Sequence, residues 1–342
     1  MSDTTDITEA ILNNYGGVDA NSLKHLFESQ FTEQENINET PDMLNSSPYI
    51  ENEQLLTLLS KNRHNLKIIS LNCQSLNAKY EQLNLYLNSL LQNPFDIICL
   101  QETWLSESSN TQLLQLAGNK MINQPYKISS HGGLSIYIKE NLKYKLIDLQ
   151  HLLISSTNRI PSSVEDTNEK LFIEVSLPTK NTNGSDKKII IGNIYRPPRD
   201  INENYVAFTN EMNIILDYFS RNNKDVILTG DFNIDLLKIK SKIVFQEYLD
   251  SLLTNGFLPK IIYPTRFFER GGTLIDNFFC KLNSPSTGEA GILLQNISDH
   301  LPYFFIFDVN ENNSVKNKFI TKRDINSHAL KALKNDLKKC KH

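Results

Sequence analysis

The sequence is poor in the features that mark disulfide-rich, secreted or membrane proteins. Its 342 residues include only four cysteines, Cys73, Cys99, Cys280 and Cys340, none in a Cys-x-x-Cys spacing, and three of them lie in apolar runs. This usage favours reduced, mostly buried thiols in an intracellular protein. The first residues lack the basic and apolar regions of a signal peptide, and no apolar stretch approaches a membrane span. We therefore expect neither secretion nor a membrane partner.

The chain also lacks a large excess of charge of one sign, although its charges are unevenly placed. Lys and Arg number 35 against 39 Asp and Glu, a net charge of −4. Residues 1–60 carry eleven acids and a single base, whereas residues 316–342 carry nine bases and two acids. We predict an acidic, loosely ordered leader at residues 1–64, one domain at 65–309, and a basic, partly helical linker at 310–342.

Within the predicted domain no repeat of fixed period occurs, and apolar strands alternate with helices. Continuous apolar runs predict buried strands at residues 66–72, 95–102, 188–195 and 225–228. Amphipathic patterns predict helices near residues 79–91, 205–219 and 244–253. This order of elements is typical of a mixed α/β architecture.

Polar side chains follow several of these strands at the point where each strand ends. Asp231 and Asn233 come directly after the run 225–228. A buried Asp is costly unless it is paired or bound to a metal, so this placement indicates function, with an ordinary Gly-Asp turn as the alternative. The same design recurs along the chain, and one sheet edge would gather Asn72, Glu102, Tyr195, Asp231, Asn233, Asp276, Asp299 and His300.

This set of side chains favours metal-assisted hydrolysis of a phosphate ester. Carboxylates are hard ligands suited to Mg²⁺, with Mn²⁺ as a substitute, and no His/Cys cluster competes for zinc. A histidine beside acids can stabilise developing charge. Structural alternatives are a core aromatic for Tyr195, a turn cap for Asn72 and a helix cap for Glu102. Trp104, the only tryptophan, fits a packing anchor better than a base-stacking platform.

The motifs resemble, in the same order, those of the endonuclease/exonuclease/phosphatase superfamily. They are Leu71-Asn72, Gln101-Glu102, Ile194-Tyr195, Gly230-Asp231-Phe232-Asn233, Ile275-Asp276 and Ser298-Asp299-His300. Further stretches look most like the apurinic-like endonuclease domain of non-LTR (LINE-type) retrotransposons: Asn77-Ala78-Lys79, Glu102-Thr103-Trp104-Leu105, Tyr195-Arg196-Pro197-Pro198 and Pro264-Thr265-Arg266. The resemblance implies a DNase I-like, four-layer α/β sandwich, in which two packed mixed β-sheets are flanked by helices and the site lies at one edge.

The resemblance also implies a metal-binding part of the site. Glu102 would be the principal metal ligand, and Asn72 beside it would help to hold the ion or the nucleophile. Asp299 would support the site or the metal. Gln74 stands where many relatives have an acid, which argues against a second metal ligand on that loop.

The remaining residues would carry out the hydrolysis itself. By resemblance, Asp231 would orient and deprotonate the attacking water, and Asn233 would bind the scissile phosphate. Tyr195 would donate its hydroxyl to a phosphate oxygen. His300, held by Asp276, would stabilise the charge that builds on the phosphoryl oxygens.

We therefore expect a Mg²⁺-dependent endonuclease that nicks duplex DNA, as in retrotransposon target-site cleavage. A reverse transcriptase domain would follow in a full-length element, but no Asp-Asp pair of the polymerase kind occurs here. Action on genomic DNA would place the protein in the nucleus. Alternatives with the same fold are an enzyme for abasic sites, inositol phosphates or sphingolipids, and a catalytically inactive DNA-binding module.

An acidic protein that binds DNA must concentrate its bases around the site, because Lys and Arg make the phosphate contacts. Candidates beside the motifs are Lys139, Lys143, Lys145, Arg196, Arg199, Arg266 and Arg270. We favour the two arginine groups over the lysines, and solvated surface charge is the alternative for all of them. Little base-reading machinery is present, which favours selection by DNA shape.

Overall fold

A computed structural model describes residues 49–126, 131–149, 168–178, 186–199, 201–268, 271–283 and 288–309. The chain divides into two units, Met1–Asn310 and Glu311–His342, and every described residue belongs to the first. The predicted linker at 310–342 and the first 48 residues of the predicted leader lie outside the described residues. No helix of the described ranges has the length and apolarity needed to cross a membrane.

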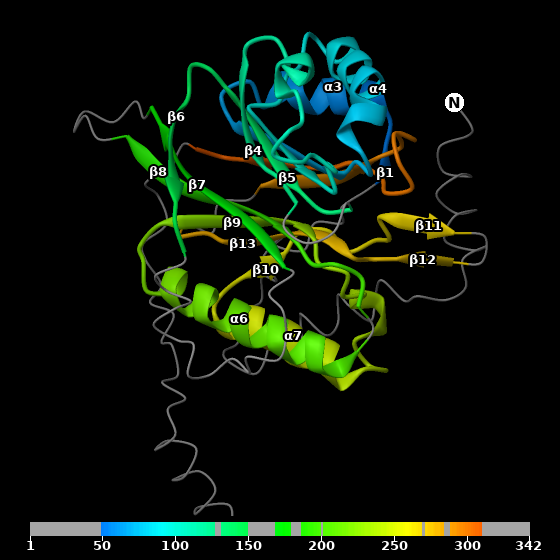
Figure 1. Cartoon of the computed structure of the whole chain (residues 1–342). Coiled ribbons are helices and arrows are strands. Elements are labelled where there is room, and N and C mark those ends of the chain that lie inside the picture. Colours follow the sequence, from blue (N-terminus) through cyan, green and yellow to red (C-terminus); the bar gives the residue numbers. More distant parts are fainter. Residues whose placement is uncertain are drawn as a thin grey trace, which may run out of the picture. The chain divides into compact units, whose positions relative to one another are not determined.

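The first sheet has seven strands and carries helices on its outer face. Its spatial order is β1 (Tyr49–Ile50), β14 (Glu289–Leu293), β15 (Tyr303–Phe307), β2 (Leu66–Asn72), β3 (Ile97–Gln101), β5 (Leu134–Lys139) and β4 (Asn119–Gln124). Strand β2 is parallel to β3 and antiparallel to β15. Helices α3 (Asn52–Lys61) and α4 (Leu76–Ser89) cover this sheet, as Figure 1 shows.

The second sheet has six strands and is covered by helices on the opposite side of the molecule (Figure 1). Its order is β10 (Leu258–Pro259), β13 (Asp276–Lys281), β9 (Asp225–Asp231), β8 (Lys187–Tyr195), β7 (Glu169–Leu177) and β6 (Lys143–Ile147). Helices α6 (Asn202–Ser220) and α7 (Ile243–Thr254) pack on it. A separate hairpin joins β11 (Arg266–Phe268) to β12 (Gly271–Thr273), and 3-10 turns occur at Thr111–Leu114 and Leu236–Lys238.

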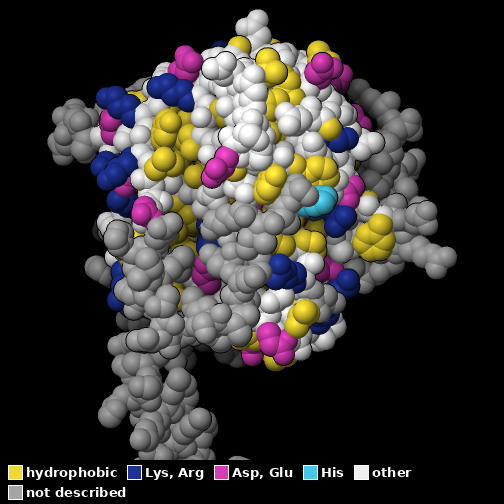
Figure 2. All heavy atoms as spheres, viewed as in Figure 1, with side chains coloured by type: hydrophobic (Ala, Val, Ile, Leu, Met, Phe, Trp, Pro, Cys, Tyr) yellow, Lys and Arg dark blue, Asp and Glu magenta, His cyan; other side chains and the backbone are white. Residues whose placement is uncertain are grey.

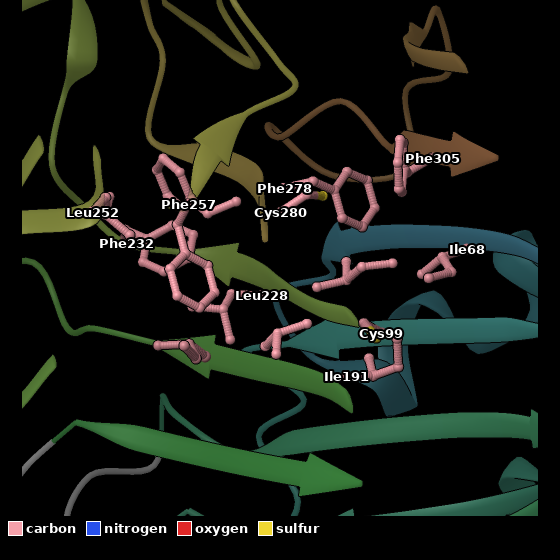
Figure 3. Close-up of a cluster of buried hydrophobic side chains, with 14 of the residues drawn as sticks. Ile68, Cys99, Ile191, Leu228, Phe232, Leu252, Phe257, Phe278, Cys280 and Phe305 are labelled. Carbon is pink, nitrogen blue, oxygen red and sulfur yellow. The ribbon is translucent and has the colours of Figure 1, made fainter. Parts of the chain in front are cut away.

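Apolar side chains fill the space between the layers. Successive residues of β2 point to opposite faces, so Ile68 joins the core between the sheets while Ile69 packs under the outer helices. Figure 3 shows Ile68 and Cys99 from the first sheet beside Ile191 and Leu228 from the second. This helix–sheet–sheet–helix arrangement confirms the predicted four-layer α/β sandwich. Three cysteines, Cys73, Cys99 and Cys280, are free and buried as predicted.

The predicted start of the domain at residue 65 is corrected by the structure, which places Tyr49–Lys61 within the fold. Strand β1 pairs with β14, and the Tyr49 hydroxyl donates a hydrogen bond of 2.8 Å to the Pro264 carbonyl. Leu55 and Leu59, one helical turn apart, are buried against the first sheet. The polar composition of this helix concealed its short apolar face.

Candidate active site

Strand register brings the predicted site residues to one end of both sheets. In the first sheet Asn72 lies opposite Gln101, so the following Glu102 emerges beside Asn72. In the second sheet Tyr195 pairs with Asp231, and Asp231 pairs with Asp276, which puts three strands' polar residues in one row. Because the two sheets are packed face to face, these two groups meet at the same edge.

Two of these residues have an uncommon backbone conformation. Glu102 has φ of 51° and Asn233 has φ of 47°, the left-handed region that non-glycine residues seldom adopt. Gly230, just before Asp231, has φ of 146°, and a Cβ there would collide with the Ile194 carbonyl oxygen. The turn after β9 therefore requires this glycine. Positive φ values gathered at a strand edge are a pattern typical of functional sites.

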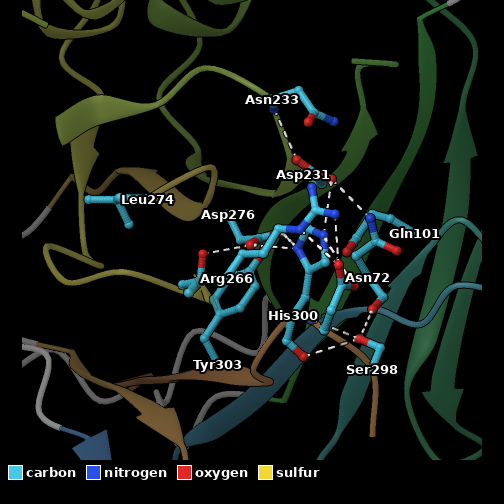
Figure 4. Close-up of polar contacts among 12 residues, drawn as sticks. Asn72, Gln101, Asp231, Asn233, Arg266, Leu274, Asp276, Ser298, His300 and Tyr303 are labelled. Carbon is cyan, nitrogen blue, oxygen red and sulfur yellow. Dashed lines mark hydrogen bonds and ion pairs between the residues drawn. The ribbon is translucent and has the colours of Figure 1, made fainter. Parts of the chain in front are cut away.

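Asp276 and His300 form a buried, hydrogen-bonded pair (Figure 4). His300 Nδ1 lies 2.9 Å from Asp276 Oδ2, and that oxygen also accepts a 2.6 Å hydrogen bond from Thr265 Oγ1. Burial alone would lower the pKa of His300, but the charge and hydrogen bond of Asp276 outweigh it and raise the pKa to about 9. His300 is then cationic at neutral pH, and Nδ1 donates to Asp276.

The outer nitrogen of His300 remains available for a ligand. Its Nε2 lies 3.9 Å from Asp299 Oδ1 and 4.0 Å from Asp231 Oδ2, beyond hydrogen-bonding distance. Among the described residues Nε2 makes no hydrogen bond at all. A charged N–H donor therefore points into the space between these two carboxylates.

Asp231 is a buried carboxylate with only neutral hydrogen-bond donors. Its Oδ2 accepts from Asn72 Nδ2 at 2.9 Å, and its Oδ1 accepts from the Asn233 backbone N–H at 2.9 Å. Burial raises the pKa of Asp231, and the neighbouring negative charge of Asp276 adds to the rise, bringing it to about 7. A carboxylate that ionises near neutral pH is suited to act as a general base.

Glu102 is oriented by two side-chain donors. Asn72 Nδ2 donates to its Oε1 at 2.9 Å, and the Trp104 indole N–H donates to its Oε2 at 3.3 Å. Burial, followed by the nearby charges of Glu102 and Asp231, raises the pKa of Tyr195. Trp104 therefore has a polar contact in addition to the packing role expected for it.

The donor set fits a hard divalent cation. Oxygens of Glu102 and Asp231 converge on one neutral amide, that of Asn72, so two acids share a single uncharged donor. Ligand atoms of Asp231, Asp276 and His300 lie within 4.8 Å of one another, but the last two are bonded to each other. Glu102 and Asp231 are therefore the carboxylates best placed to take an ion.

Asp299 is brought beside the site but is engaged by an arginine. Its Oδ2 lies 2.8 Å from Arg266 Nε and 2.7 Å from Arg266 Nη2, and both side chains are 38% exposed. The main chains of Arg266 and His300 form an isolated antiparallel bridge, which fixes the hairpin against the site. Arg266 thus lies partly exposed beside the site, and its contact with DNA stays a prediction.

The remaining basic candidates behave differently from one another. Arg196, predicted to contact DNA, is only 2% exposed and its guanidinium is bonded to main-chain carbonyls, so this assignment is corrected. Arg199, three residues on, is exposed. Arg270 lies outside the described residues.

The lysine group lies at the wrong end of the sheets to reach the site. Lys145 pairs with Glu174, five residues along β7 from Glu169 at the level of Tyr195, a separation of about 17 Å. Lys139 directly follows Ile138, which pairs with Ile97 at the start of β3, and Lys139 forms an ion pair with Asp96. Figure 2 shows basic side chains gathered over this end, where β6 lies in Figure 1. These lysines follow the Gly132-Gly133 motif in the sequence, but that closeness did not show that the strands carry them away from the site.

Several residues of the site were given no role by the sequence. Thr265 bonds Asp276, and Ser298 Oγ donates to the Asn72 carbonyl at 2.6 Å. Glu169, buried on β7, pairs with Tyr195 and so adds a fourth strand to the row of Tyr195, Asp231 and Asp276. Its Oε2 accepts a hydrogen bond from the Gly133 N–H at 2.5 Å. Thr265 and Ser298 stand inside recognised motifs, which was the available signal. Glu169 has none, because its position depends on pairing across β8.

Comparisons with solved structures bear on the fold that carries this site. Among solved structures, the chain is similar to the AP endonuclease LMAP from Leishmania major, with 13% identity, a TM-score of 0.56, and coverage of 83% of this chain and 99% of that one. The human Nocturnin catalytic domain with bound sulfate shares 14% identity at a TM-score of 0.50, covering 72% and 94%. Humanized D. rerio TDP2 shares 15% identity at 0.50, covering 72% and 99%.

At these identities the similarity shows a shared fold. No curated protein matches the sequence at a significant level. The model of the Endonuclease/Exonuclease/phosphatase family matches residues 69–300, well over half of the chain. This span begins inside β2 and ends on His300, so it contains both groups of site residues. The chain therefore belongs to the endonuclease/exonuclease/phosphatase family.

Proposed function

We propose that this protein is a divalent-metal-dependent endonuclease that nicks duplex DNA. The observation that carries the proposal is the free Nε2 of His300, a cationic donor held by Asp276 and directed at the gap between Asp231 and Asp299. A phosphodiester is an anion that gains further charge on its phosphoryl oxygens during hydrolysis. A fixed, charged N–H donor at that point stabilises the transition state more than the ground state.

Asp231 supplies the base for the reaction. The oxygen of a water molecule attacks phosphorus and its proton passes to Asp231, while the bond from phosphorus to the leaving oxygen breaks and that oxygen takes a proton from solvent. A pKa near 7 leaves a substantial fraction of Asp231 ionised at neutral pH. Asn233, which holds the Asp231 carboxylate through its backbone N–H, would bind the phosphate through its side-chain amide.

Glu102 and Asp231, with Asn72 between them, would hold Mg²⁺ or Mn²⁺. Such an ion polarises a phosphoryl oxygen and lowers the pKa of bound water. Tyr195, whose pKa is raised by burial and then by the nearby charge of Glu102, would donate its hydroxyl proton to a phosphate oxygen from the second sheet. The role of Asp299 in this scheme is to support the site, because its outer oxygen is occupied by Arg266.

DNA is the substrate favoured by the surroundings of the site. Arg266 and Arg199 lie at the same end of the sheets as the catalytic groups and are accessible to backbone phosphates. The sequence stretches Glu102–Leu105 and Tyr195–Pro198 are similar to those of LINE-type endonucleases. We infer a retrotransposon-type nickase acting on genomic DNA, and hence in the nucleus.

A second candidate is cleavage at abasic sites, since one structural neighbour is named an AP endonuclease. The two candidates share the fold and the hydrolytic groups, so they differ only in the DNA that is bound. An oligonucleotide duplex with one abasic site, compared with its intact counterpart, separates them. Preference for intact duplex supports the nickase, and cleavage confined to the abasic strand supports the alternative.

The decisive experiment is incubation of the purified protein with supercoiled plasmid and Mg²⁺, with and without EDTA. We expect conversion to the nicked circle with Mg²⁺ alone. His300→Ala should lower the rate roughly 10²–10⁴-fold, the usual scale for a charge-stabilising group. Activity that survives chelation would refute the metal-dependent mechanism, and a folded protein inactive under all metals would leave a DNA-binding module.

A further inference from the structure

Among the predicted DNA contacts that the structure describes, Arg196 is the one that the fold buries, at 2% exposure. It directly follows Tyr195 at the end of β8, and its backbone N–H donates to the Asp231 carbonyl at 2.9 Å. No carboxylate lies within 4.0 Å of its guanidinium among the described residues. Burying a cation without a paired acid is costly, and burial lowers the pKa of Arg196. Such a group needs a reason beyond general stability.

Two hydrogen bonds join Arg196 to the turn that follows Asp231, and two further contacts hold its guanidinium in place. Its Nη1 donates to the Asn233 carbonyl at 3.1 Å, and Asn233 Nδ2 donates back to the Arg196 carbonyl at 2.7 Å. Its Nη2 donates to the Arg199 carbonyl at 2.8 Å. The guanidinium lies 3.9 Å from the ring centroid of Tyr205 on α6, which seats it against the helix.

These contacts restrain a residue that would not hold its conformation unaided. Asn233 has φ of 47°, a conformation that non-glycine residues seldom adopt, and its backbone N–H donates to Asp231 Oδ1 at 2.9 Å. Its side-chain amide, anchored on the Arg196 carbonyl by one hydrogen, keeps a second hydrogen for another acceptor. Lysine cannot replace Arg196 here, because a single ammonium group does not reproduce the planar guanidinium that donates to two carbonyl oxygens.

We propose that Arg196 is a positioning residue that fixes the Asp231–Asn233 turn, so that base and phosphate-binding amide are set by one buried cation. The expected change in kcat rests on the proposed function, whereas the restraint on the turn rests on the contacts alone. Arg196 acts through Asn233 and Asp231 and does not touch DNA. The exposed neighbour Arg199, whose carbonyl it holds, is the matched control for a DNA contact.

The test combines kinetics with hydrogen exchange on Arg196→Lys, Arg199→Lys and Arg199→Ala. Arg196→Lys should lower kcat roughly 10–10²-fold, the scale of a misplaced catalytic group, with KM and the salt dependence of binding unchanged. In an Asn233→Ala background the same change should cost under about 3-fold, because coupled residues are not additive. A DNA contact would instead lower affinity, reduce the salt slope by about one, and be rescued by lysine.

Hydrogen exchange measures the restraint without any substrate. Amide exchange across Asp231–Asn233 should speed up at least 10-fold in Arg196→Lys and stay unchanged in both Arg199 variants. Unaltered exchange in a folded Arg196→Lys protein would overturn the proposal, whether or not the parent nicks DNA. If that variant does not fold, Tyr205→Leu removes the seat of the guanidinium and should speed up the same amides, and unchanged exchange there would equally overturn it.

Discussion

Strand β9 begins and ends with a buried aspartate, and its two ends differ in how that charge is satisfied. Asp225, at the start, is 2% exposed and forms an ion pair of 2.9 Å with Lys187. Its other oxygen accepts from the Asn283 N–H at 2.6 Å. Asp231, at the end, is 1% exposed and has no Lys or Arg within 4.0 Å in the described part of the chain.

Within seven residues, the difference distinguishes an acid that is paired inside the fold from the acid to which we assign a catalytic role. Asp225 forms a close ion pair with the lysine Lys187. Asp231 instead lies near Asp276 and accepts hydrogen bonds from neutral donors only, and the His300 Nε2 is 4.0 Å away, beyond hydrogen-bonding distance. Burial alone does not distinguish the two, but the identity of the partner does.

The largest expected effect is on activity, and it should be confined to one end of the strand. Asp231→Asn removes the base and should reduce nicking roughly 10²–10⁴-fold, because an amide cannot take the proton from water. Asp225→Asn, its matched control on the same strand, should leave kcat within about 3-fold when assayed well below its unfolding temperature. Equal losses in both variants would show that the distinction drawn here is wrong.

The second prediction concerns stability at the opposite end. Asp225→Asn keeps the acceptor for the Asn283 N–H but removes the carboxylate that lies 2.9 Å from Lys187 Nζ, in a site where only 14% of the lysine side chain is exposed. We expect a loss of about 3 kcal/mol in the free energy of unfolding, the low end for a broken buried pair. Denaturant titration measures it. Restoration in the double variant Asp225→Asn, Lys187→Met would confirm that the loss of this ion pair is the cause.

The third prediction is that Asp231→Asn stabilises the protein in the presence of chelator. The folded state raises the pKa of Asp231 from 3.8 to about 7, so between these pH values it binds more protons than the unfolded state. Stability of the parent therefore falls as pH rises through this window, and the variant lacks this titration.

The variant's advantage should grow from pH 4 to pH 7 and then level off, at a value on the order of 1 kcal/mol after the loss of the Asn72 hydrogen bond to the charged carboxylate. Thermal unfolding across pH, with EDTA throughout, measures the difference. A parent that remains the more stable protein at pH 8 would indicate that Asp231 is adequately satisfied within the fold.

The strand-end residues could be predicted from the sequence because each follows a recognisable apolar run. Asn72 and Asp231 end buried strands, and parallel neighbours bring such ends together. The pairing of Asp276 with His300 was expected from resemblance and is now seen in contact. Local pattern and motif order were enough for this part of the site.

Other features depend on contacts that no local pattern contains. Arg196 stands before two prolines, where an arginine is ordinarily solvated, and its burial arises from Tyr205 and from Asn233, 37 positions away. Strand β1 pairs with β14 at the other end of the domain. Lys143 follows closely after Gly133 along the chain, but the β5 strand carries it away from the site.

The smallest expected effect on stability concerns another acid beside the site, Asp299, which adds a half-exposed case to the comparison of Asp225 with Asp231. Its pair with Arg266 is 38% exposed on both sides, so solvent screens it, and Arg266→Ala should change stability by less than about 1 kcal/mol. The same change should weaken DNA binding about equally across sequences and reduce the slope of log K against log salt by about one, because a phosphate contact is lost.

Lys143→Ala, at the far end of the second sheet, is the control and should alter neither quantity. Filter binding at several salt concentrations, with EDTA present to prevent cleavage, measures both variants on two unrelated duplexes. If Arg266→Ala weakened binding to one duplex only, Arg266 would recognise the base sequence rather than the DNA backbone. If the variant left the salt slope unchanged, Arg266 would serve only to pair with Asp299, and its role would be structural, like that of Lys187.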